Sequence, residues 1–529
     1  MQRQKKIEIN LPNKIKAMKQ LSFLLLLMIH FSFYVNAQNT TINNMQRSAL
    51  QTSDVIKQGS EVKGYYFFYI SDKIDRRTNQ YTLRIMDNNL NVLKDITFED
   101  SKGVTVLEAS FNGTDLLFLF YNEEERTFDY QLYGADGKKK PYTYSRILGK
   151  RENLYIQEFY QNFRDDERSF KGIYPVDEKG FISNTPSLDD GHFSFQVNYF
   201  SSEKKKQWSF TPLDDAKRII GDYLGQSKNI VYLSTLKYKS SFSGNPESTI
   251  IGLDLETGKM LFEKPTYGKF RFSPSSISVL NGQVYIYGEY YNSDDNIVKD
   301  HSLGLAIWSL DNKGKIITEK YNSWENDLSK YLSVSSKGKI EDFGYLFLHN
   351  MIQTPDGNIY AIGEGYKRVA SGLGIALKVM GGNTSVTKFQ ITDLAVINFD
   401  KDFNLKGVKI YPKTETNIEM SSQFDFVSVS LLGKHIKYTM GGFDYRYVQA
   451  NGDNSNFSIC YSDFEKTKDY KGGTFKSISF NNGKFTEDRI ATKSAASSSW
   501  VLPGKLGQVL LIDYYKKEKR LEAHFEKLN

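Results

Sequence analysis

Short apolar runs, rich in aromatic and β-branched residues, alternate with Gly, Asn and Asp along most of the chain. Residues 281–290 read NGQVYIYGEY and residues 356–365 read DGNIYAIGEG, so these two stretches are near copies of each other. Each copy predicts a tight turn followed by a strand, because Asn-Gly and Asp-Gly accept the positive φ angles of hairpin turns. Looser copies occur at 112–118, 227–233 and 507–512. The pattern predicts an all-β protein built from repeats.

A second motif follows most of these copies. It consists of an apolar strand, a turn that contains Asp, and a Gly-Lys pair or its equivalent, as in 251–259 and 307–315. Two hairpins per repeat give a four-stranded unit, and a ring of such units leaves only short strand edges exposed. The sequence therefore predicts a β-propeller with seven or eight four-stranded blades. Its units lie near 62–100, 109–146, 153–212, 226–265, 281–322, 345–413 and 424–489, and a half-unit at 506–527 is expected to be completed by an N-terminal strand.

Two stretches depart from the repeat. Residues 324–333 carry apolar residues at helical spacing after Ser323, which can serve as an N-cap, and they predict the one helix of the chain. Residues 365–392 are rich in Gly and Ser and interrupt a unit, so we expect a long loop on one rim of the propeller.

The first 37 residues have the pattern of a signal peptide. Leu21 to Val35 is an almost unbroken apolar run of 15 residues behind a basic start, which is too short to span a bilayer. The run ends in small residues before a predicted cleavage site at Gln38, and either its basic region is long or translation begins at Met18. We expect residues 38–529 to form one propeller domain, exported to the periplasm or the cell exterior, with no membrane span left after cleavage.

The leader also carries most of the positive charge. The whole chain has a net charge of +7, and removal of residues 1–37 leaves 63 basic and 61 acidic residues, a net charge of +2. So balanced a chain gives no electrostatic reason to expect nucleic-acid binding. Cys460 is the only cysteine, so no disulfide can form within the chain, and its strand-like surroundings predict a buried apolar side chain.

The familiar motifs of enzymes and metal sites are incomplete. Residues 400–404 (DKDFN) have the spacing of calcium ligands, but Leu405 and Tyr411 stand where a calcium loop needs Gly and Glu. A hairpin turn explains the motif better. Residues 372–374 (GLG) lack the third glycine of a dinucleotide-binding loop. We therefore expect no metal and no cofactor. Catalysis by paired carboxylates depends on three-dimensional placement, which spacing does not reveal.

Two glutamates mark the best candidate for a ligand site. Glu289 and Glu364 each follow a Gly inside an apolar strand, at matching places of neighbouring repeats. Either they pair with a nearby Lys or backbone amide, as structural carboxylates do, or they lie at the rim or channel where propellers bind ligands. In the second interpretation four polar residues close in sequence join them, and the expected rim site is Glu289, Glu364, Lys367, Arg368, Asp300 and His301.

The Gly-Glu strands, and the turns at 86–92 (MDNNLNV) and 399–405 (FDKDFNL), resemble the repeats of uncharacterised secreted bacterial β-propeller proteins, a domain family of unknown function. The resemblance covers most of the chain after the leader. It implies an architecture like that of WD40 and quinoprotein propellers. It implies no activity, because no functional residue of those proteins has a match in this chain.

These features favour an exported binding or scaffold module of the cell envelope, expected to be a monomer, whose ligand is an envelope protein or glycan. One alternative is a hydrolase or lyase that acts on glycans with carboxylates at the propeller rim. Another is a sensory or assembly component with a fixed partner. Polar side chains that converge in a deep rim pocket would favour the enzyme, and a broad exposed aromatic patch would favour the component.

Overall fold

The computed structural model describes most of the chain from residue 39 onward. The described residues are 39–45, 47–48, 53–58, 61–101, 104–122, 125–134, 138–154, 172–176, 178–189, 192–203, 207–214, 216–227, 229–239, 244–380, 385–419, 427–492 and 494–528. The predicted signal peptide, residues 1–37, lies outside them. No helix among these residues is long and apolar enough to cross a membrane.

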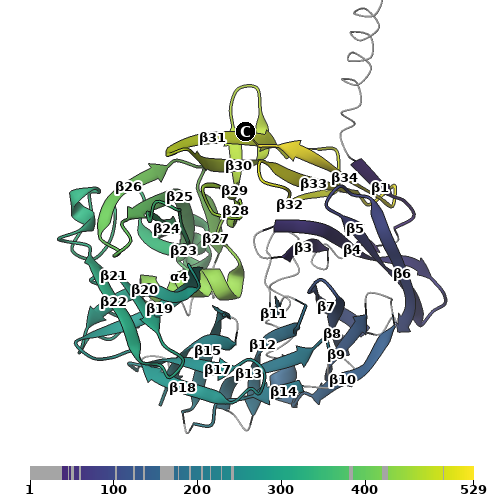
Figure 1. Cartoon of the computed structure of the whole chain (residues 1–529), viewed down its shortest axis with the longest axis horizontal. Coiled ribbons are helices and arrows are strands. Elements are labelled where there is room, and N and C mark those ends of the chain that lie inside the picture. The colour runs from purple at the N-terminus through teal and green to yellow at the C-terminus, as the bar shows by residue number, and fades with distance from the viewer. Residues whose placement is uncertain are drawn as a thin grey trace, which may run out of the picture.

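Within these residues the strands form eight blades arranged as a ring (Figure 1). Neighbouring strands within a blade are antiparallel, and one eight-stranded sheet consists of two blades joined by a single parallel bridge between Phe193 and Arg218. The predicted β-propeller is therefore confirmed, with the higher of the two expected blade numbers.

The strands of the first four blades follow the chain in order. Blade 1 contains β2 (Arg47–Ser48), β3 (Asp54–Gln58), β4 (Glu61–Lys73), β5 (Thr78–Asp87) and β6 (Val92–Ser101). Blade 2 contains β7 (Val104–Phe111), β8 (Asp115–Asn122), β9 (Thr127–Gly134) and β10 (Lys139–Ile147). Blade 3 contains β11 (Ile173–Val176), β12 (Gly180–Asp189), β13 (His192–Ser201) and β14 (Gln207–Phe210). Blade 4 contains β15 (Arg218–Gln226), β16 (Ile230–Tyr238), β17 (Glu247–Asp254) and β18 (Met260–Pro265).

The second half of the ring is built in the same way. Blade 5 contains β19 (Phe270–Leu280), β20 (Gln283–Asn292), β21 (Gly304–Leu310) and β22 (Ile316–Ser323). Blade 6 contains β23 (Tyr345–Gln353), β24 (Ile359–Ala370), β25 (Thr387–Phe399), β26 (Leu405–Tyr411) and β27 (Thr416–Glu419). Blade 7 contains β28 (Tyr445–Ala450), β29 (Asn456–Lys466), β30 (Lys471–Asn481) and β31 (Lys484–Ala491). Blade 8 contains β32 (Ser498–Pro503), β33 (Gln508–Tyr515) and β34 (Arg520–Lys527).

An N-terminal strand completes the last blade. β1 (Asn39–Ile42) pairs with β34 from Asn39 opposite His524 to Ile42 opposite Leu521. Ile42 and Met45 are almost fully buried against blade 8. The expected completion of the C-terminal half-unit by an N-terminal strand is therefore present, and the first and last described strands, β1 and β34, are paired in one sheet (Figure 1).

The core is divided among the blade interfaces. One cluster of buried apolar side chains lies between each pair of neighbouring blades, eight clusters in all within the described residues. Aromatic rings dominate several of them, such as Phe68 of blade 1, whose centroid is 4.6 Å from that of Phe118 of blade 2. Cys460 is buried between blades 7 and 8, which confirms the predicted buried side chain, and burial raises the pKa of its thiol to about 12.

Asp residues close the outer hairpins. Asp87, Asp311 and Asp400 each accept two hydrogen bonds from backbone N–H groups two and four residues further on, at 2.8–2.9 Å. These side chains replace a backbone turn, which explains the repeated Asp motif in the sequence. The calcium-like spacing at 400–404 belongs to one of these turns.

The helices differ from the prediction. Residues 324–333 form only a 3-10 turn, η2 (Leu328–Lys330), because Trp324 is buried in the interface between blades 5 and 6 and tertiary packing overrides the helical spacing. The expected loop at 365–392 is wrong as well: β24 and β25 continue into it as a hairpin, and α3 (Gly372–Val379) lies at its end. A further helix, α4 (Val429–His435), continues as the π-helical turn η4 (Ile436–Met440).

Candidate functional site

The first strand of several blades carries a β-bulge at the same level of the ring. The extra residue is Leu107 in blade 2, Leu224 in blade 4, Ser275 in blade 5, His349 in blade 6 and Arg446 in blade 7. The first strands of neighbouring blades contact one another, as β15 contacts β19 and β19 contacts β23, so they form the inner wall. Since bulges re-aim side chains and are common beside functional sites, this level of the inner wall is the place to look for a site.

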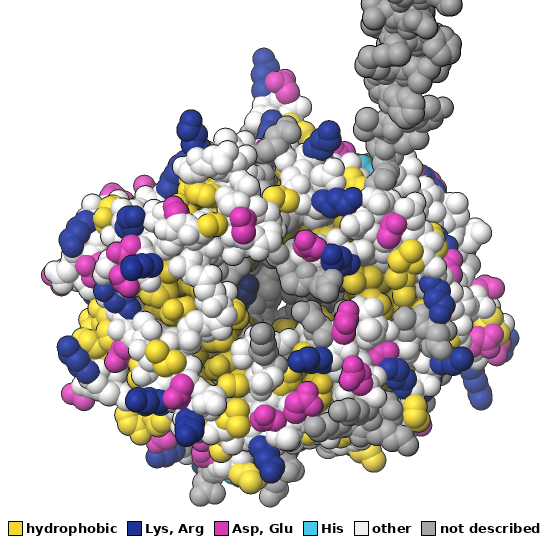
Figure 2. Space-filling view, viewed as in Figure 1, with side chains coloured by type: hydrophobic (Ala, Val, Ile, Leu, Met, Phe, Trp, Pro, Cys, Tyr) yellow, Lys and Arg dark blue, Asp and Glu magenta, His cyan; other side chains and the backbone are white. Residues whose placement is uncertain are grey.

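A helical segment between blades 6 and 7 lies against this wall near the middle of the ring (Figure 1). Ser428 begins it: the Ser428 hydroxyl accepts a hydrogen bond from Leu431 N at 3.4 Å and donates one to the Ile297 carbonyl at 2.8 Å. Leu432 and Ile436 are buried against blade 6. The segment is therefore fixed to blades 5 and 6. The space-filling view shows a hollow at the middle of the face, bordered by both acidic and basic side chains (Figure 2).

The polar side chains of this segment reach the inner strands of blades 4 and 5. Lys434 Nζ lies 3.6 Å from Asp222 Oδ2 and 3.3 Å from Ser234 Oγ, both in blade 4. Tyr438 donates its hydroxyl hydrogen to the carbonyl of the bulge residue Ser275. These contacts tie the helix to blades far from it in sequence.

Glu289 lies in a small pocket between the segment and blades 5 and 6. Its carboxylate accepts hydrogen bonds from Ser430 of α4 and from the Tyr291 hydroxyl, the latter at 3.3 Å. The cavity has a volume of about 20 Å³, which is room for one water-sized group. Its lining includes three serines, one tyrosine and one lysine: Ser273, Ser275, Ser430, Tyr366 and Lys434.

The surroundings of Glu289 favour its protonated form. Part of the side chain surface is still accessible, but protein atoms enclose it on most sides. Burial raises the pKa of Glu289 to about 7, against the opposing effect of hydrogen bonds from Ser302 and Tyr291. Glu289 therefore changes its charge near neutral pH.

Glu364 occupies the equivalent position in blade 6. Glu289 lies opposite Ser273 and Glu364 opposite Phe347, in each case two residues before the bulge of the first strand. The expectation that the two glutamates occupy matching places in adjacent blades is therefore met.

The carboxylate of Glu364 forms its hydrogen bonds and ion pairs with other groups of the protein. It accepts hydrogen bonds from the backbone N–H groups of Asp444 (3.2 Å) and Tyr445 (3.1 Å), which begin blade 7. Its other close neighbours are Lys413 Nζ and His349 Nε2, each at 3.3 Å. Burial raises the pKa of Glu364, and Lys413 with the two backbone amides opposes that rise. These contacts fit the interpretation of Glu364 as a structural carboxylate that pairs with a lysine and with backbone amides.

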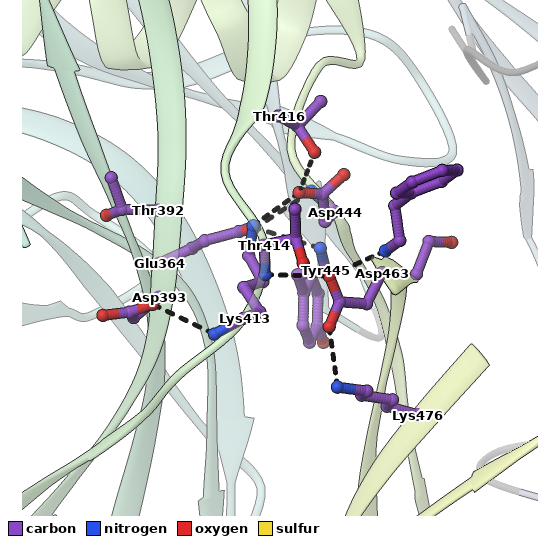
Figure 3. A network of polar contacts seen from close by, with 12 residues as sticks. Glu364, Thr392, Asp393, Lys413, Thr414, Thr416, Asp444, Tyr445, Asp463 and Lys476 are labelled. Atoms are coloured by element: carbon purple, nitrogen blue, oxygen red, sulfur yellow. Dashed lines mark hydrogen bonds and ion pairs between the residues drawn. The ribbon is translucent and has the colours of Figure 1, made fainter. Parts of the chain in front are cut away.

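Lys413 links Glu364 to a wider network of ion pairs (Figure 3). Its Nζ also lies 2.5 Å from Asp444 Oδ2, and its side chain is fully buried. Burial disfavours the charge of Lys413, but the carboxylates of Glu364 and Asp444 outweigh it and raise its pKa. The next residue, Thr414, donates its N–H to Asp463, which pairs in turn with Lys476 at 2.8 Å. The network joins blades 6 and 7.

His349, the bulge residue of blade 6, is a buried neutral imidazole. Burial, and then the nearby Lys437, hold its pKa well below the usual value. Its Nε2 is 3.3 Å from Glu364, but the geometry is not that of a hydrogen bond, so within the described residues neither ring nitrogen has a hydrogen-bond partner. The ring stacks on Tyr445 with centroids 4.6 Å apart.

Two further bases of the helical segment line the middle of the ring. Burial lowers the pKa of Lys437 to about 8 and that of His435 to about 4. Protein atoms surround both side chains, yet each keeps some accessible surface, as expected of residues in the wall of a narrow opening. Lys437 also lies over the ring of Tyr445 at 5.6 Å.

The other four residues of the expected rim site do not join the two glutamates. Lys367 pairs with Glu415 at 2.6 Å, and Arg368 donates to the Val427 carbonyl at 2.6 Å. Asp300 accepts from Asn296 N at 2.6 Å in the exposed turn after β20, and His301 is exposed beside it. Lys367 and Arg368 follow Glu364 closely in sequence, but the hairpin of blade 6 carries them away from the inner wall. Asp300 and His301 lie in an exposed turn beyond the end of β20.

The sequence contains a signal for the helical segment, although the sequence prediction placed the one helix at 324–333. Leu431, Ile436 and Met440 recur at near-helical spacing after Ser428, the residue that caps the helix. No local signal marked Asp222 or Lys413 as members of the buried centre, since long-range pairing alone brings them there.

Among the described residues, no group of three or more His, Cys, Asp or Glu side chains is arranged to hold a metal ion. The arrangement instead offers hydroxyl groups, one titratable carboxyl and one lysine around a water-sized cavity. Such groups can bind a polar ligand or transfer a proton to it.

Comparison with solved structures finds matches at low similarity. The quinohemoprotein alcohol dehydrogenase ADHIIG from Pseudomonas putida HK5 has a TM-score of 0.42 and 9% identity over 92% of this chain and 77% of that chain. The WD40 domain of SCAP from fission yeast has a TM-score of 0.35 and 8% identity over 92% of this chain and 98% of that chain. A prolyl endopeptidase has a TM-score of 0.36 and 9% identity, and this chain spans about half of its length, 54%.

No curated protein matches the chain. The family DUF6770, described as a family of unknown function, matches residues 18–529. That match runs from Met18 onward and covers all eight blades. The chain therefore belongs to the DUF6770 family of unknown function.

Proposed function

We propose that this protein is an exported binding module of the cell envelope that binds a glycan at the centre of its ring, beside α4 and η4, with one hydroxyl group of the glycan in the water-sized Glu289 pocket. The observation that carries the proposal is the Glu289 pocket, where hydroxyl groups from two blades and the central helix surround one carboxyl group. Serine and tyrosine hydroxyls both donate and accept hydrogen bonds, and they match the hydroxyl groups of sugars. Export rests on the N-terminal leader.

The contacts that Glu364 already makes within the protein favour binding over hydrolysis by two carboxylates. A glycosidase needs two carboxyl groups that are free to act on the substrate. Glu364, which corresponds to Glu289 in the next blade, already accepts two backbone hydrogen bonds and contacts Lys413. Only Glu289 keeps an environment that a ligand can change.

Glycan binding is tested with the mature protein, residues 38–529, against immobilised peptidoglycan fragments and neutral and acidic polysaccharides. Glu289→Gln should weaken binding at least about tenfold, because it alters the group at the centre of the pocket. Glu487→Gln, on the exposed outer strand β31, is the matched control and should bind as the wild type does. Equal affinity of wild type and Glu289→Gln, or binding to envelope proteins and to no glycan, would contradict the proposal.

The pKa of Glu289 favours a glycan hydrolase or lyase as the second candidate, because a carboxyl group with a pKa of about 7 suits a general acid at neutral pH. Mass spectrometry of the same polysaccharides after incubation separates the two functions. Shortened chains with the wild type, and none with Glu289→Gln, would establish the enzyme. Intact chains with retained binding support the binding module.

A further inference from the structure

The hairpin of blade 6 extends beyond its own sheet. β23 pairs with β24 only as far as Tyr366, whereas β24 and β25 stay paired to Ala370 opposite Thr387. The short strand β27 borders the other edge of this extension. The result is a ribbon that projects from the blade and carries α3 at its end.

α3 is firmly attached to the ribbon although it is short. The Ser371 hydroxyl caps it by accepting a hydrogen bond from Gly374 N at 3.1 Å. Ser371 N donates to the Val386 carbonyl at 2.8 Å. Gly374 packs directly on the backbone of Ser385, where a Cβ atom would lie 1.9 Å from the carbonyl oxygen. The helix is therefore held by its N-terminal turn and leaves its other side chains outside.

These side chains are apolar and exposed. Every residue of α3 except Gly374 is exposed. Five large apolar side chains of the helix and its C-cap are accessible to solvent: Leu373 (73%), Ile375 (44%), Leu377 (39%), Val379 (83%) and Met380 (82%). Single exposed apolar residues are common on proteins, but a compact group of five marks an interaction site.

The apolar side chains do not form one stripe. Successive residues of an α-helix are turned by about 100°, so Leu373, Leu377 and Met380 share one side while Ile375 and Val379 lie nearly opposite. A groove on a partner protein would cover one side of the helix and leave the other side exposed to water. An apolar medium that surrounds the tip covers both.

The charge of the hairpin points to the nature of that medium. Residues 365–392 contain four basic residues, Lys367, Arg368, Lys378 and Lys388, and no Asp or Glu. Lys367 pairs with Glu415, Arg368 donates to the Val427 carbonyl, and Lys388 lies opposite Glu419 of β27. Lys378 is the basic residue that α3 itself exposes beside the apolar side chains. An apolar tip within a basic segment is the pattern of a protein that inserts into the interface of an anionic bilayer.

We infer that α3 and Met380 form a membrane anchor, which inserts into the headgroup region of an anionic lipid bilayer while the propeller stays outside. The anchor lies on the rim and is separate from the Glu289 pocket, so it does not depend on the proposed function.

The test uses the mature protein, residues 38–529, and flotation with two kinds of vesicle. One kind contains phosphatidylglycerol and phosphatidylethanolamine, and the other contains only phosphatidylcholine. The anchor variant is Leu373→Ser with Leu377→Ser and Met380→Ser. The matched control replaces three exposed apolar residues elsewhere: Leu93→Ser, Leu213→Ser and Ile317→Ser, whose side chains are 65%, 100% and 59% exposed.

The wild type and the control should float with the anionic vesicles, and the anchor variant should bind at least about tenfold more weakly. Lys378→Gln should weaken binding less and reduce its dependence on salt. Equal flotation of wild type and anchor variant would overturn the inference, as would equal binding of the wild type to both vesicle types. Light scattering without lipid tests the competing occupant: a wild-type dimer that the anchor variant converts to a monomer would assign the tip to a second copy of the chain. Circular dichroism confirms that each variant is folded.

Discussion

Two glutamates at one register position acquire different properties from their neighbours. Glu364 meets a lysine and two backbone amides, whereas Glu289 meets hydroxyl groups and a small cavity. The sequence identified both residues and their equivalence through the Gly-Glu repeat. It did not identify what they contact, because Lys413 and Ser430 come from segments that only the ring brings to these positions.

The titration of Glu289 should make the stability of the fold depend on pH. Its folded pKa, about 7, lies above the unfolded value of 4.5, so the folded state holds the proton more tightly. The stabilising effect of that proton is present below about pH 4.5 and is lost as the pH rises through about 7. The free energy of unfolding of the wild type should fall relative to Glu289→Gln by up to about 3 kcal/mol between pH 4.5 and 8.

Urea denaturation of both proteins at a series of pH values measures this difference, and all other titrating groups cancel in the comparison. A difference that stays constant across the range would show that Glu289 titrates normally.

Removing the charge of Glu364 should cost much more than removing that of an exposed glutamate. Glu364→Gln leaves Lys413 buried with one carboxylate fewer, and loss of one partner from a buried ion pair costs about 3–5 kcal/mol. Glu415→Gln removes a partly exposed pair with Lys367 and should cost less than about 1 kcal/mol. Urea denaturation at pH 7 gives both values. A similar small loss for both variants would mean that the buried network contributes little to stability.

At the scale of elements, the second strands of the blades were easier to predict than the first strands, which form the inner wall. β20 and β24 begin with clear turns and apolar runs, and both were placed correctly to within a few residues. β15 (RIIGDYLGQ) and β19 (FRFSPSSISVL) were missed, because their bulges and their polar inner face break the alternation that marks a strand. The inner wall that carries the candidate site is therefore the part of the fold that was hardest to predict from the sequence.

The contact between α4 and blade 6 predicts opposite effects of one substitution in two helices. A Cβ atom at Gly433 would lie 2.6 Å from the Tyr366 hydroxyl, which donates to the Val429 carbonyl. Gly433→Ala should therefore destabilise the protein, although Ala is favoured over Gly in helices by about 1 kcal/mol. Gly372→Ala in α3 meets no atom within 4 Å and should be neutral or slightly stabilising. Thermal denaturation followed by circular dichroism compares the two, and a gain in stability for both would refute the close packing of α4 on Tyr366.

At the scale of the molecule, the ring distributes its core over eight interfaces and closes it with a strand from the other end of the chain. Turn motifs and repeat lengths predicted the architecture, since each hairpin is a local feature. The blade number stayed open at seven or eight, because blades 3 and 4 share a continuous sheet and their inner strands carry weak signals. Closure followed from the incomplete last unit, which needed a fourth strand to cover its edge.

The closing strand provides the last prediction. Without β1, the backbone of β34 is an open edge, and the pocket that holds Ile42 and Met45 is exposed. A protein that begins at Arg47 should therefore melt at a lower temperature than one that begins at Gln38 and should aggregate through the open edge. A synthetic peptide of residues 38–46, added to the shortened protein, should restore most of the melting temperature, and a scrambled peptide of the same composition should not. Rescue by the native peptide, and not by the scrambled one, would show that strand pairing stabilises the ring, because β1 pairs with β34 along its whole length. An unchanged melting temperature in the shortened protein would mean that the ring is held by its blade interfaces and does not depend on closure.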